Sequence, residues 1–210
     1  MDYIYLHGFA SGPGSYKGQW LTSRFQQQQL CLALPDLNQG DFYHLTLTRQ
    51  IHQIGKLMAG PTTLIGSSLG GLVAAWVSQH YLQVERLVLL APAFRFLEQW
   101  LPKLTPDQRH QWQYGPGLSV YHYGLQQQTR LGHGFLTDLQ QYSDTQLTRP
   151  VPTHILHGRW DEVIALSSSQ QYASQRPWVT LETLETDHAM ASAMESIWQR
   201  IVALCDLQPT

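Results

Sequence analysis

The fold is decided by residues 62–77, Thr62-Thr63-Leu64-Ile65-Gly66-Ser67-Ser68-Leu69-Gly70-Gly71-Leu72-Val73-Ala74-Ala75-Trp76-Val77. The first four residues are β-branched or apolar and predict a buried strand over Thr62–Ile65. An Ala- and Val-rich segment that starts at Leu69 predicts a helix packed tightly against its surroundings. A buried strand that passes into a helix through a short glycine-rich turn is typical of parallel α/β sheets.

The same alternation of apolar runs and helical stretches extends over most of the chain. Strands are predicted at Tyr3–Leu6, Leu30–Leu34, Thr62–Ile65, Arg86–Leu90, Thr153–Leu156 and Trp178–Leu184. Helices are predicted at Tyr16–Gln28, Tyr43–Met58, Leu69–His80, Ser168–Gln175 and Met190–Leu204. This order predicts an α/β fold, a single domain over residues 1–210 with a mostly parallel sheet flanked by helices.

The alternation breaks once, between Pro92 and Pro150. This segment carries several prolines and many aromatic side chains, among them Phe94, Phe96, Trp100, Trp112, Tyr114, Tyr121, Tyr123 and Phe135. Helical pieces are predicted at Phe94–Leu101, Pro106–Trp112 and Phe135–Tyr142. We expect residues 92–150 to be a small cap or lid inserted over one edge of the sheet.

Composition excludes two classes of protein. Of the 210 residues, 43% are hydrophobic, which a globally disordered chain would not be. The 13 basic and 15 acidic residues give a net charge of −2 without a basic cluster, so the footprint of a nucleic-acid-binding protein is absent.

The sequence also shows no pattern typical of a signal peptide or a membrane span. Residues 1–6 carry no basic segment and no long apolar run, and the most apolar window, residues 62–77, is too short for a membrane span and is broken by glycines and serines. We therefore expect a cytoplasmic protein without a membrane span, in which Cys31 and Cys205 are buried free thiols.

The turn between the strand and the helix carries a candidate nucleophile. Gly66-Ser67-Ser68-Leu69-Gly70 matches the pattern G-x-S-x-G with Ser68 at its centre. A serine in such a sharp turn holds its hydroxyl above the sheet, and the two flanking glycines lack the side chains that would collide there. Ser67 is the neighbouring rival, but the symmetry of the glycines favours Ser68.

A general base and an acid are expected later in the chain, in the order Ser, Asp, His. His188 lies between the last predicted strand and the last predicted helix, where it can reach back over the edge of the sheet. Asp161 follows the strand Thr153–Leu156 and can orient the histidine. Asp187 is a rival acid that we expect to cap the helix instead, and Asp144 is a weaker rival inside the insertion.

Two backbone amides are candidates for an oxyanion hole, the pair of donors that stabilises negative charge on a reacting carbonyl oxygen. His7-Gly8-Phe9 stands at the end of the first predicted strand, and Leu69 follows the candidate nucleophile. We predict that the N–H groups of Phe9 and Leu69 form this hole, and that His7 braces the turn.

Other patterns compete less well. Gly12-Pro13-Gly14 followed by Asp36 is similar to a dinucleotide-binding fingerprint, but its third glycine is displaced, because Lys17 occupies that position. His154 and His157 have the spacing of a metal pair, but residues three apart on one strand face opposite sides. No cofactor and no metal are therefore expected.

Taken together, the quoted motifs resemble a known family. His7-Gly8-Phe9 with Ser11, Gly12, Pro13, Ser15 and Lys17, then residues 66–71, and finally Asp187-His188 resemble the small YqiA-type esterases of the α/β-hydrolase superfamily. The resemblance spans most of the chain and is weakest over residues 94–150. It implies a reduced α/β-hydrolase fold with the catalytic triad Ser68, Asp161 and His188. The loop at residues 158–162 follows the family pattern only in part, which leaves Glu162 as an alternative acid.

The implied activity is hydrolysis of carboxylic esters, and of acyl thioesters such as acyl-CoA, through an acyl-enzyme. The expected partner is a small ester or thioester, whose acyl group would lie against Phe9, Phe94 and Trp160. Two alternatives stay open: a catalytically silent hydrolase-like module that binds a small hydrophobic ligand, and an acyltransferase or lyase that uses the same serine.

Overall fold

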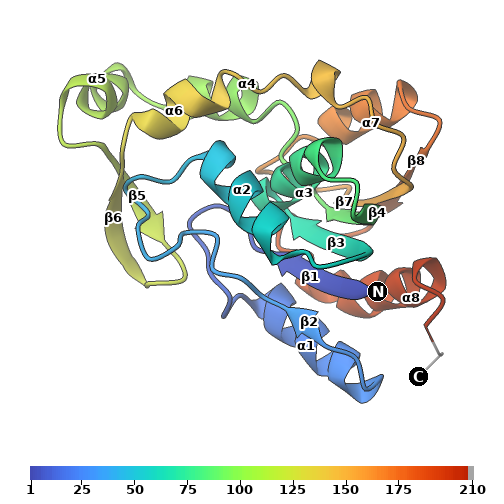
Figure 1. Ribbon diagram of the computed structural model, residues 1–210. Coiled ribbons are helices and arrows are strands. Elements are labelled where there is room, and N and C mark those ends of the chain that lie inside the picture. The colour runs from blue at the N-terminus through green and yellow to red at the C-terminus, as the bar shows by residue number, and fades with distance from the viewer. Residues whose placement is uncertain (208–210) are drawn as a thin grey trace.

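The computed structural model describes residues 1–207 and contains one large sheet within them. Its strand order is β2-β1-β3-β4-β7-β8, and every neighbouring pair is parallel (Figure 1). The strands are β1 (Asp2–Leu6), β2 (Leu32–Ala33), β3 (Thr62–Ser67), β4 (Val84–Leu90), β7 (Thr153–Gly158) and β8 (Val179–Leu184). The predicted parallel α/β fold is confirmed.

Helices cover both faces of this sheet. They are α1 (Tyr16–Gln27), α2 (Leu47–Leu57), α3 (Leu69–His80), α7 (Leu166–Ser174) and α8 (Met194–Leu204). Figure 1 shows α1 and α8 together on one face, with α2 and α3 on the other. No helix within residues 1–207 is both long and apolar enough to cross a membrane.

The core consists of two apolar layers, one on each face, because successive side chains of a strand point to opposite sides. In β4, Leu87 and Leu89 join the layer under α2 and α3, whereas Val88 and Leu90 join the layer under α1 and α8. This two-sided burial explains why the strand is apolar without interruption.

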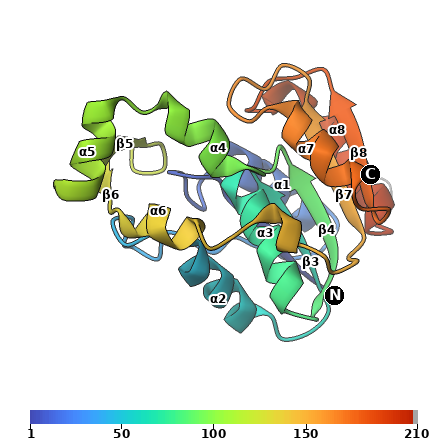
Figure 2. The same cartoon turned by 90° about the horizontal axis from the view of Figure 1, so that it is seen from above.

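The segment between Pro92 and Pro150 connects β4 to β7. It contains α4 (Phe96–Trp100), η1 (Leu101–Lys103), α5 (Pro106–Tyr114), β5 (Leu118–His122), β6 (Gln127–Leu131), α6 (Gly134–Leu139) and η2 (Asp144–Gln146). Figure 2 shows that α4 and α6 lie on the same side of the molecule as α2 and α3. The antiparallel hairpin β5–β6 was not predicted.

This hairpin contacts the first 45 residues of the chain. The Tyr123 N–H donates to the carbonyl oxygen of Ala10 (2.7 Å), and the Gly132 N–H donates to that of Tyr43 (2.8 Å). The insertion is therefore tied to the loop that follows β1 and to the loop that follows β2.

Several boundaries differ from the prediction, among them those of β2, α2 and α8. The strand β2 is shorter than Leu30–Leu34, because the Leu30 N–H bonds back to Phe25 and closes α1. The helix α2 begins at Leu47 and not at Tyr43, because the Thr46 side chain accepts the Arg49 N–H and caps the helix there. The helix α8 begins at Met194 after a short 3₁₀ turn.

The expectation of two buried thiols is half wrong. Cys205 is buried, but Cys31 is exposed. Cys31 lies just before the edge strand β2, where Leu32 turns inward and its neighbours on either side turn toward solvent. A side chain at an edge strand is covered on one face only.

Candidate active site

Ser68 occupies the turn between β3 and α3, with φ 54° and ψ −120°. This left-handed φ is rare for a residue with a side chain, so the surroundings must hold it in place. The backbone of Gly70 lies against that of Leu6: a Cβ added at Gly70 would come closer than 3.0 Å to the Leu6 carbonyl oxygen. The glycine spacing quoted from the sequence thus permits the tight contact between β1, β3 and α3.

His188 reaches Ser68 from the loop between β8 and α8. Its Nε2 lies 3.2 Å from the Ser68 Oγ, and its Nδ1 lies 2.7 Å from Oδ2 of Asp161. The three side chains come from the carboxyl ends of β3, β7 and β8, which meet at one edge of a parallel sheet. The structure therefore brings together the three residues expected from the sequence.

The Asp161 carboxylate is fully buried and firmly held. Oδ1 accepts the N–H groups of Val163 (2.9 Å) and Ile164 (2.7 Å), and Oδ2 lies beside both His188 and His157. Burial raises the pKa of this carboxyl, but hydrogen bonds from His157, His188 and the Ile164 amide outweigh it and hold the pKa well below its usual range. Asp161 is therefore ionised at neutral pH.

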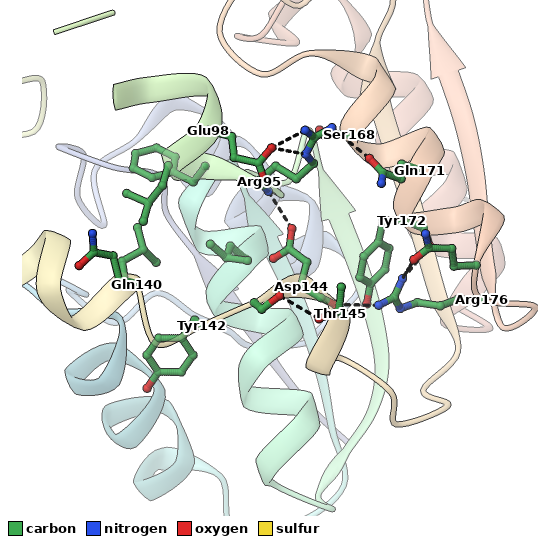
Figure 3. A pocket seen from close by; sticks show the side chains of 16 residues that line it. Arg95, Glu98, Gln140, Tyr142, Asp144, Thr145, Ser168, Gln171, Tyr172 and Arg176 are labelled. Carbon is green, nitrogen blue, oxygen red and sulfur yellow. Dashed lines mark hydrogen bonds and ion pairs between the residues drawn. The ribbon is translucent and has the colours of Figure 1, made fainter. Parts of the chain in front are cut away.

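The rival acids lie elsewhere. Asp187 Oδ1 accepts the Met190 N–H (3.0 Å) and so caps the turn that leads into the last helix. Glu162 is exposed. Asp144 lines a cavity of about 360 Å³ between the insertion and α7, where its Oδ2 accepts the Arg95 N–H (Figure 3). Among the carboxylates of residues 1–207, only Asp161 is hydrogen-bonded to His188.

The two candidate oxyanion donors lie on either side of Ser68. Leu69 follows Ser68 at the start of α3, and Phe9 follows Gly8, whose added Cβ would lie 3.4 Å from the Ser68 Cβ. Within residues 1–207, the N–H groups of Phe9 and Leu69 make no hydrogen bond. Both donors are thus available, and their role as an oxyanion hole stays a prediction.

Comparison with known proteins identifies the family of this chain. The model of an uncharacterised protein family, UPF0227, matches residues 2–205. The chain belongs to the UPF0227 family. This is the YqiA-type family, and the match confirms the resemblance seen in the sequence.

Solved structures similar to this UPF0227 member have the α/β-hydrolase fold. A protein of the α/β superfamily from Xanthomonas campestris pv. campestris is 20% identical, with a TM-score of 0.65 and 98% of each chain covered. Mouse alpha/beta hydrolase domain-containing protein 10 is 18% identical, with a TM-score of 0.77 over 98% of this chain and 89% of that one.

A monoacylglycerol lipase from Paleococcus ferrophilus is 14% identical, with a TM-score of 0.72 over 96% of this chain and 92% of that one. At these identities the likeness shows the fold alone. Comparison with curated proteins finds no significant match.

The aromatic residues expected around the substrate divide into three environments in this UPF0227 protein. The Phe9 ring lies 5.4 Å from that of Trp100 and 5.6 Å from those of Phe42 and Phe135, between centroids. Phe94 is fully buried and stacks on Tyr172 at 3.9 Å. Trp160 is 61% exposed. Phe42 was not foreseen, because its sequence neighbours give no indication of a contact with Phe9.

Two further residues near the triad were also missed as functional candidates. The Lys17 Nζ donates to the carbonyl oxygen of Ala189 (2.9 Å), next to His188, and burial lowers the pKa of this lysine. His157 Nε2 lies 3.2 Å from Asp161 Oδ2. Lys17 belongs to the N-terminal motif that carries the family resemblance, so the sequence contains a signal for it. For His157 the sequence offers only the spacing of a metal pair with His154.

His7 has the bracing role expected of it. Its Nε2 accepts the Leu37 N–H (3.0 Å), which joins the loop after β1 to the loop after β2. The other ring nitrogen lies 2.9 Å from the Gly8 carbonyl oxygen. Burial lowers the pKa of His7, so the neutral ring is favoured.

The histidines considered as a metal pair lie on opposite sides of β7. His154 is 3.6 Å from the Glu182 carboxylate, whereas His157 is buried beside Asp161. Across residues 1–207, no group of three His, Cys, Asp or Glu side chains is arranged to hold a metal ion.

Proposed function

We propose that this protein is a serine hydrolase that cleaves carboxylic esters through an acyl-enzyme on Ser68. The observation that carries the proposal is the hydrogen-bonded chain from Ser68 Oγ through His188 to Asp161, with separations of 3.2 and 2.7 Å. Nucleophile, base and orienting acid within hydrogen-bonding distance are what acyl transfer by serine requires.

The first half of the reaction forms the acyl-enzyme. Because Nδ1 faces the ionised Asp161, it carries the ring proton of His188, and Nε2 is left to accept the proton of the Ser68 hydroxyl. Ser68 Oγ bonds to the ester carbonyl carbon, and the carbonyl oxygen becomes negative between the Phe9 and Leu69 N–H groups. His188 then gives its proton to the leaving alcohol as the ester bond breaks.

The second half releases the acid. His188 takes a proton from water, and the hydroxide oxygen bonds to the acyl carbon of the ester on Ser68. When the tetrahedral intermediate collapses, the proton returns from His188 to Ser68 Oγ. Asp161 stabilises the imidazolium in both halves and stays ionised throughout.

We infer the substrate class from the aromatic side chains around Phe9, which follows Gly8 beside Ser68. The aromatic cluster around Phe9 favours an apolar acyl group, and the fold is shared with a monoacylglycerol lipase, which acts on an ester. Acyl thioesters present the same carbonyl chemistry to Ser68 and form the second part of the proposal. The alternatives, a silent binding module or a transferase, are outcomes of the tests below.

A fluorophosphonate probe tests the nucleophile directly. We expect it to label the wild-type protein at Ser68 and to leave Ser68→Ala unlabelled. Ser67→Ala is the matched control, because Ser67 is the adjacent hydroxyl at the end of β3, and it should still be labelled. Failure to label wild-type protein with a native circular dichroism spectrum would contradict the proposal and favour the silent module.

Product analysis separates hydrolysis from transfer. With p-nitrophenyl butyrate and butyryl-CoA in water, we expect free butyrate as the main acyl product. Addition of a primary alcohol at moderate concentration should divert only a small share of the acyl group. An acyl product formed mainly on the alcohol would identify a transferase, and turnover by Ser68→Ala would exclude Ser68 as the nucleophile.

A further inference from the structure

His157 contacts the acid of the proposed triad, although it is remote from the reacting atoms. It lies near the carboxyl end of β7 and has no exposed surface. Its Nε2 is 3.2 Å from Asp161 Oδ2, the same oxygen that lies 2.7 Å from His188 Nδ1. One carboxylate oxygen therefore contacts two imidazole rings.

The surroundings define which nitrogen of His157 carries the proton. Nε2 faces two acceptors, the Ile164 carbonyl oxygen at 3.0 Å and Asp161 Oδ2. Nδ1 lies 2.8 Å from the hydroxyl of Ser169 on α7, which can donate to it. The arrangement fits a neutral ring with the proton on Nε2, shared between the two acceptors.

His157 thus holds the turn at residues 161–164 in two ways. It contacts the Asp161 carboxylate directly through Oδ2, and it also binds the carbonyl oxygen of Ile164. The N–H of Ile164 in turn donates to Oδ1 of Asp161 (2.7 Å). Ser169, itself fully buried, fixes the ring of His157 from α7. Orientation of the acid is accordingly set by β7 and α7 as well as by its own loop.

We propose that His157 is a positioning residue, supported by Ser169, that keeps the Asp161 carboxylate under Nδ1 of His188. This inference rests on the proposed function, since it concerns the same triad. Partners of this kind around metal-binding histidines typically change activity 10–100-fold when they are removed. We expect a similar loss here, because Asp161 would keep its charge but not its direction.

The test compares three variants. His157→Leu removes both polar contacts, and His157→Gln can return an N–H donor toward Asp161 and Ile164. His154→Leu is the matched control, because His154 lies three residues away on the same strand and contacts Glu182 instead of the triad. We expect kcat for a p-nitrophenyl ester to fall about 10–100-fold in His157→Leu, with KM unchanged. The His157→Gln variant should recover part of this kcat. The His154→Leu variant should have the kcat of the wild type.

Two further readouts distinguish positioning from a merely structural role. The downfield proton resonance of the His188–Asp161 hydrogen bond should weaken or vanish in His157→Leu and persist in His154→Leu and His157→Gln. The acid limb of the kcat/KM profile should move to lower pH in His157→Leu, because a displaced carboxylate no longer stabilises the imidazolium. Lys17, which interacts with this carboxylate, and Asp187, which interacts with Lys17, are unchanged in all three variants.

Ser169→Ala keeps the inference testable if His157→Leu fails to fold. Loss of the hydroxyl should reduce kcat in the same direction and weaken the same resonance. Unchanged kcat and an unchanged resonance in folded His157→Leu, or in folded Ser169→Ala if His157→Leu does not fold, would overturn the inference. If instead the wild-type protein takes no fluorophosphonate label, the proposed function itself fails.

Discussion

Asp161 and Asp187 are two carboxylates near one histidine with different tasks. Asp161 accepts two backbone N–H groups through Oδ1 and faces His188 through Oδ2. Within residues 1–207, the Asp187 carboxylate accepts a hydrogen bond only from the Met190 N–H, in the backbone of its own loop. The first contact sets the proton position on the histidine, and the second only shapes the loop.

We therefore expect Asp161→Asn to lower kcat about 10³–10⁴-fold, since an amide that turns its NH₂ toward His188 favours the wrong tautomer. Asp187→Asn keeps an oxygen for the Met190 N–H and should change kcat less than about tenfold. Steady-state hydrolysis of a p-nitrophenyl ester by both variants checks this, with folding monitored by circular dichroism. Equal losses in the two variants would reject the assignment of the acid.

The site residues differ in how far the sequence could predict them. Ser68 and His188 follow from local motifs and from their order after strands, and the structure brings them together as expected. Lys17 stands in the N-terminal motif, but the contacts that Lys17 and His157 make near the triad form only in the folded chain. Lys17 contacts Ala189, a residue 172 positions away, and no local pattern predicts such a contact.

At the scale of elements, the turn between β3 and α3 is the tightest junction in the site. A Cβ at Gly70 would be closer than 3.0 Å to the carbonyl oxygens of Leu6 and His7. Both are backbone atoms of the segment that leads to Phe9, and they cannot rotate away as a flexible side chain could. By contrast, an added Cβ at Gly14 would meet no atom within 4 Å.

Gly70→Ala should therefore destabilise the protein by about 1–3 kcal/mol, as overpacking does. Alanine would gain at most about 1 kcal/mol in helix propensity, so the steric term decides the sign. Urea unfolding measures the change, and ester hydrolysis should fall as the loop at Phe9 moves. Gly14→Ala is the matched control and should stay within about 0.5 kcal/mol of wild type. A Gly70→Ala variant as stable and active as wild type would show that this contact is not required.

Element types could be predicted from the sequence, but their ends and one hairpin could not. Apolar runs in the sequence predict the strands of the large sheet, and helical spacing predicts the helices that flank it. The start of α2 was misplaced because the cap at Thr46 outweighs the apolar spacing before it. The hairpin β5–β6 was missed because Gln127–Leu131 is largely polar and has no apolar alternation. Its pairing and its contacts with Ala10 and Tyr43 stabilise it instead.

At the scale of the whole molecule, both ends of the insertion meet at Asp144 beside α7. Its carboxylate accepts the N–H of Arg95, near the start of the insertion, and its carbonyl oxygen accepts from Arg176 just after α7. The Arg176 guanidinium also lies 3.9 Å from the centroid of the Tyr172 ring (Figure 3). The Tyr172 ring also stacks on that of Phe94. The half-buried Asp144 thus connects the two ends of the insertion to the segment that follows α7.

Burial raises the pKa of Asp144 to about 6, although the Arg95 N–H and the neighbouring arginines oppose it. The unfolded chain has the ordinary value near 4, so the folded protein holds this proton more tightly. The resulting stability is fully present below about pH 4 and is lost as the pH rises through 6. A difference of about two pKa units limits the effect to about 3 kcal/mol.

Asp144→Asn keeps an oxygen for the Arg95 N–H but carries no charge at any pH. We expect it to be more stable than wild type at pH 7.5, by at most about 3 kcal/mol, with the difference shrinking toward pH 4.5. Urea unfolding at both pH values measures this. Glu98→Gln is the matched control, because Glu98 is exposed and its pKa is lowered by the hydrogen bond from Arg95, so its loss should not stabilise the protein at pH 7.5. If Asp144→Asn is instead less stable at pH 7.5, attraction to Arg95 and Arg176 outweighs the cost of burying the carboxylate, and the charged form is what holds the insertion to α7.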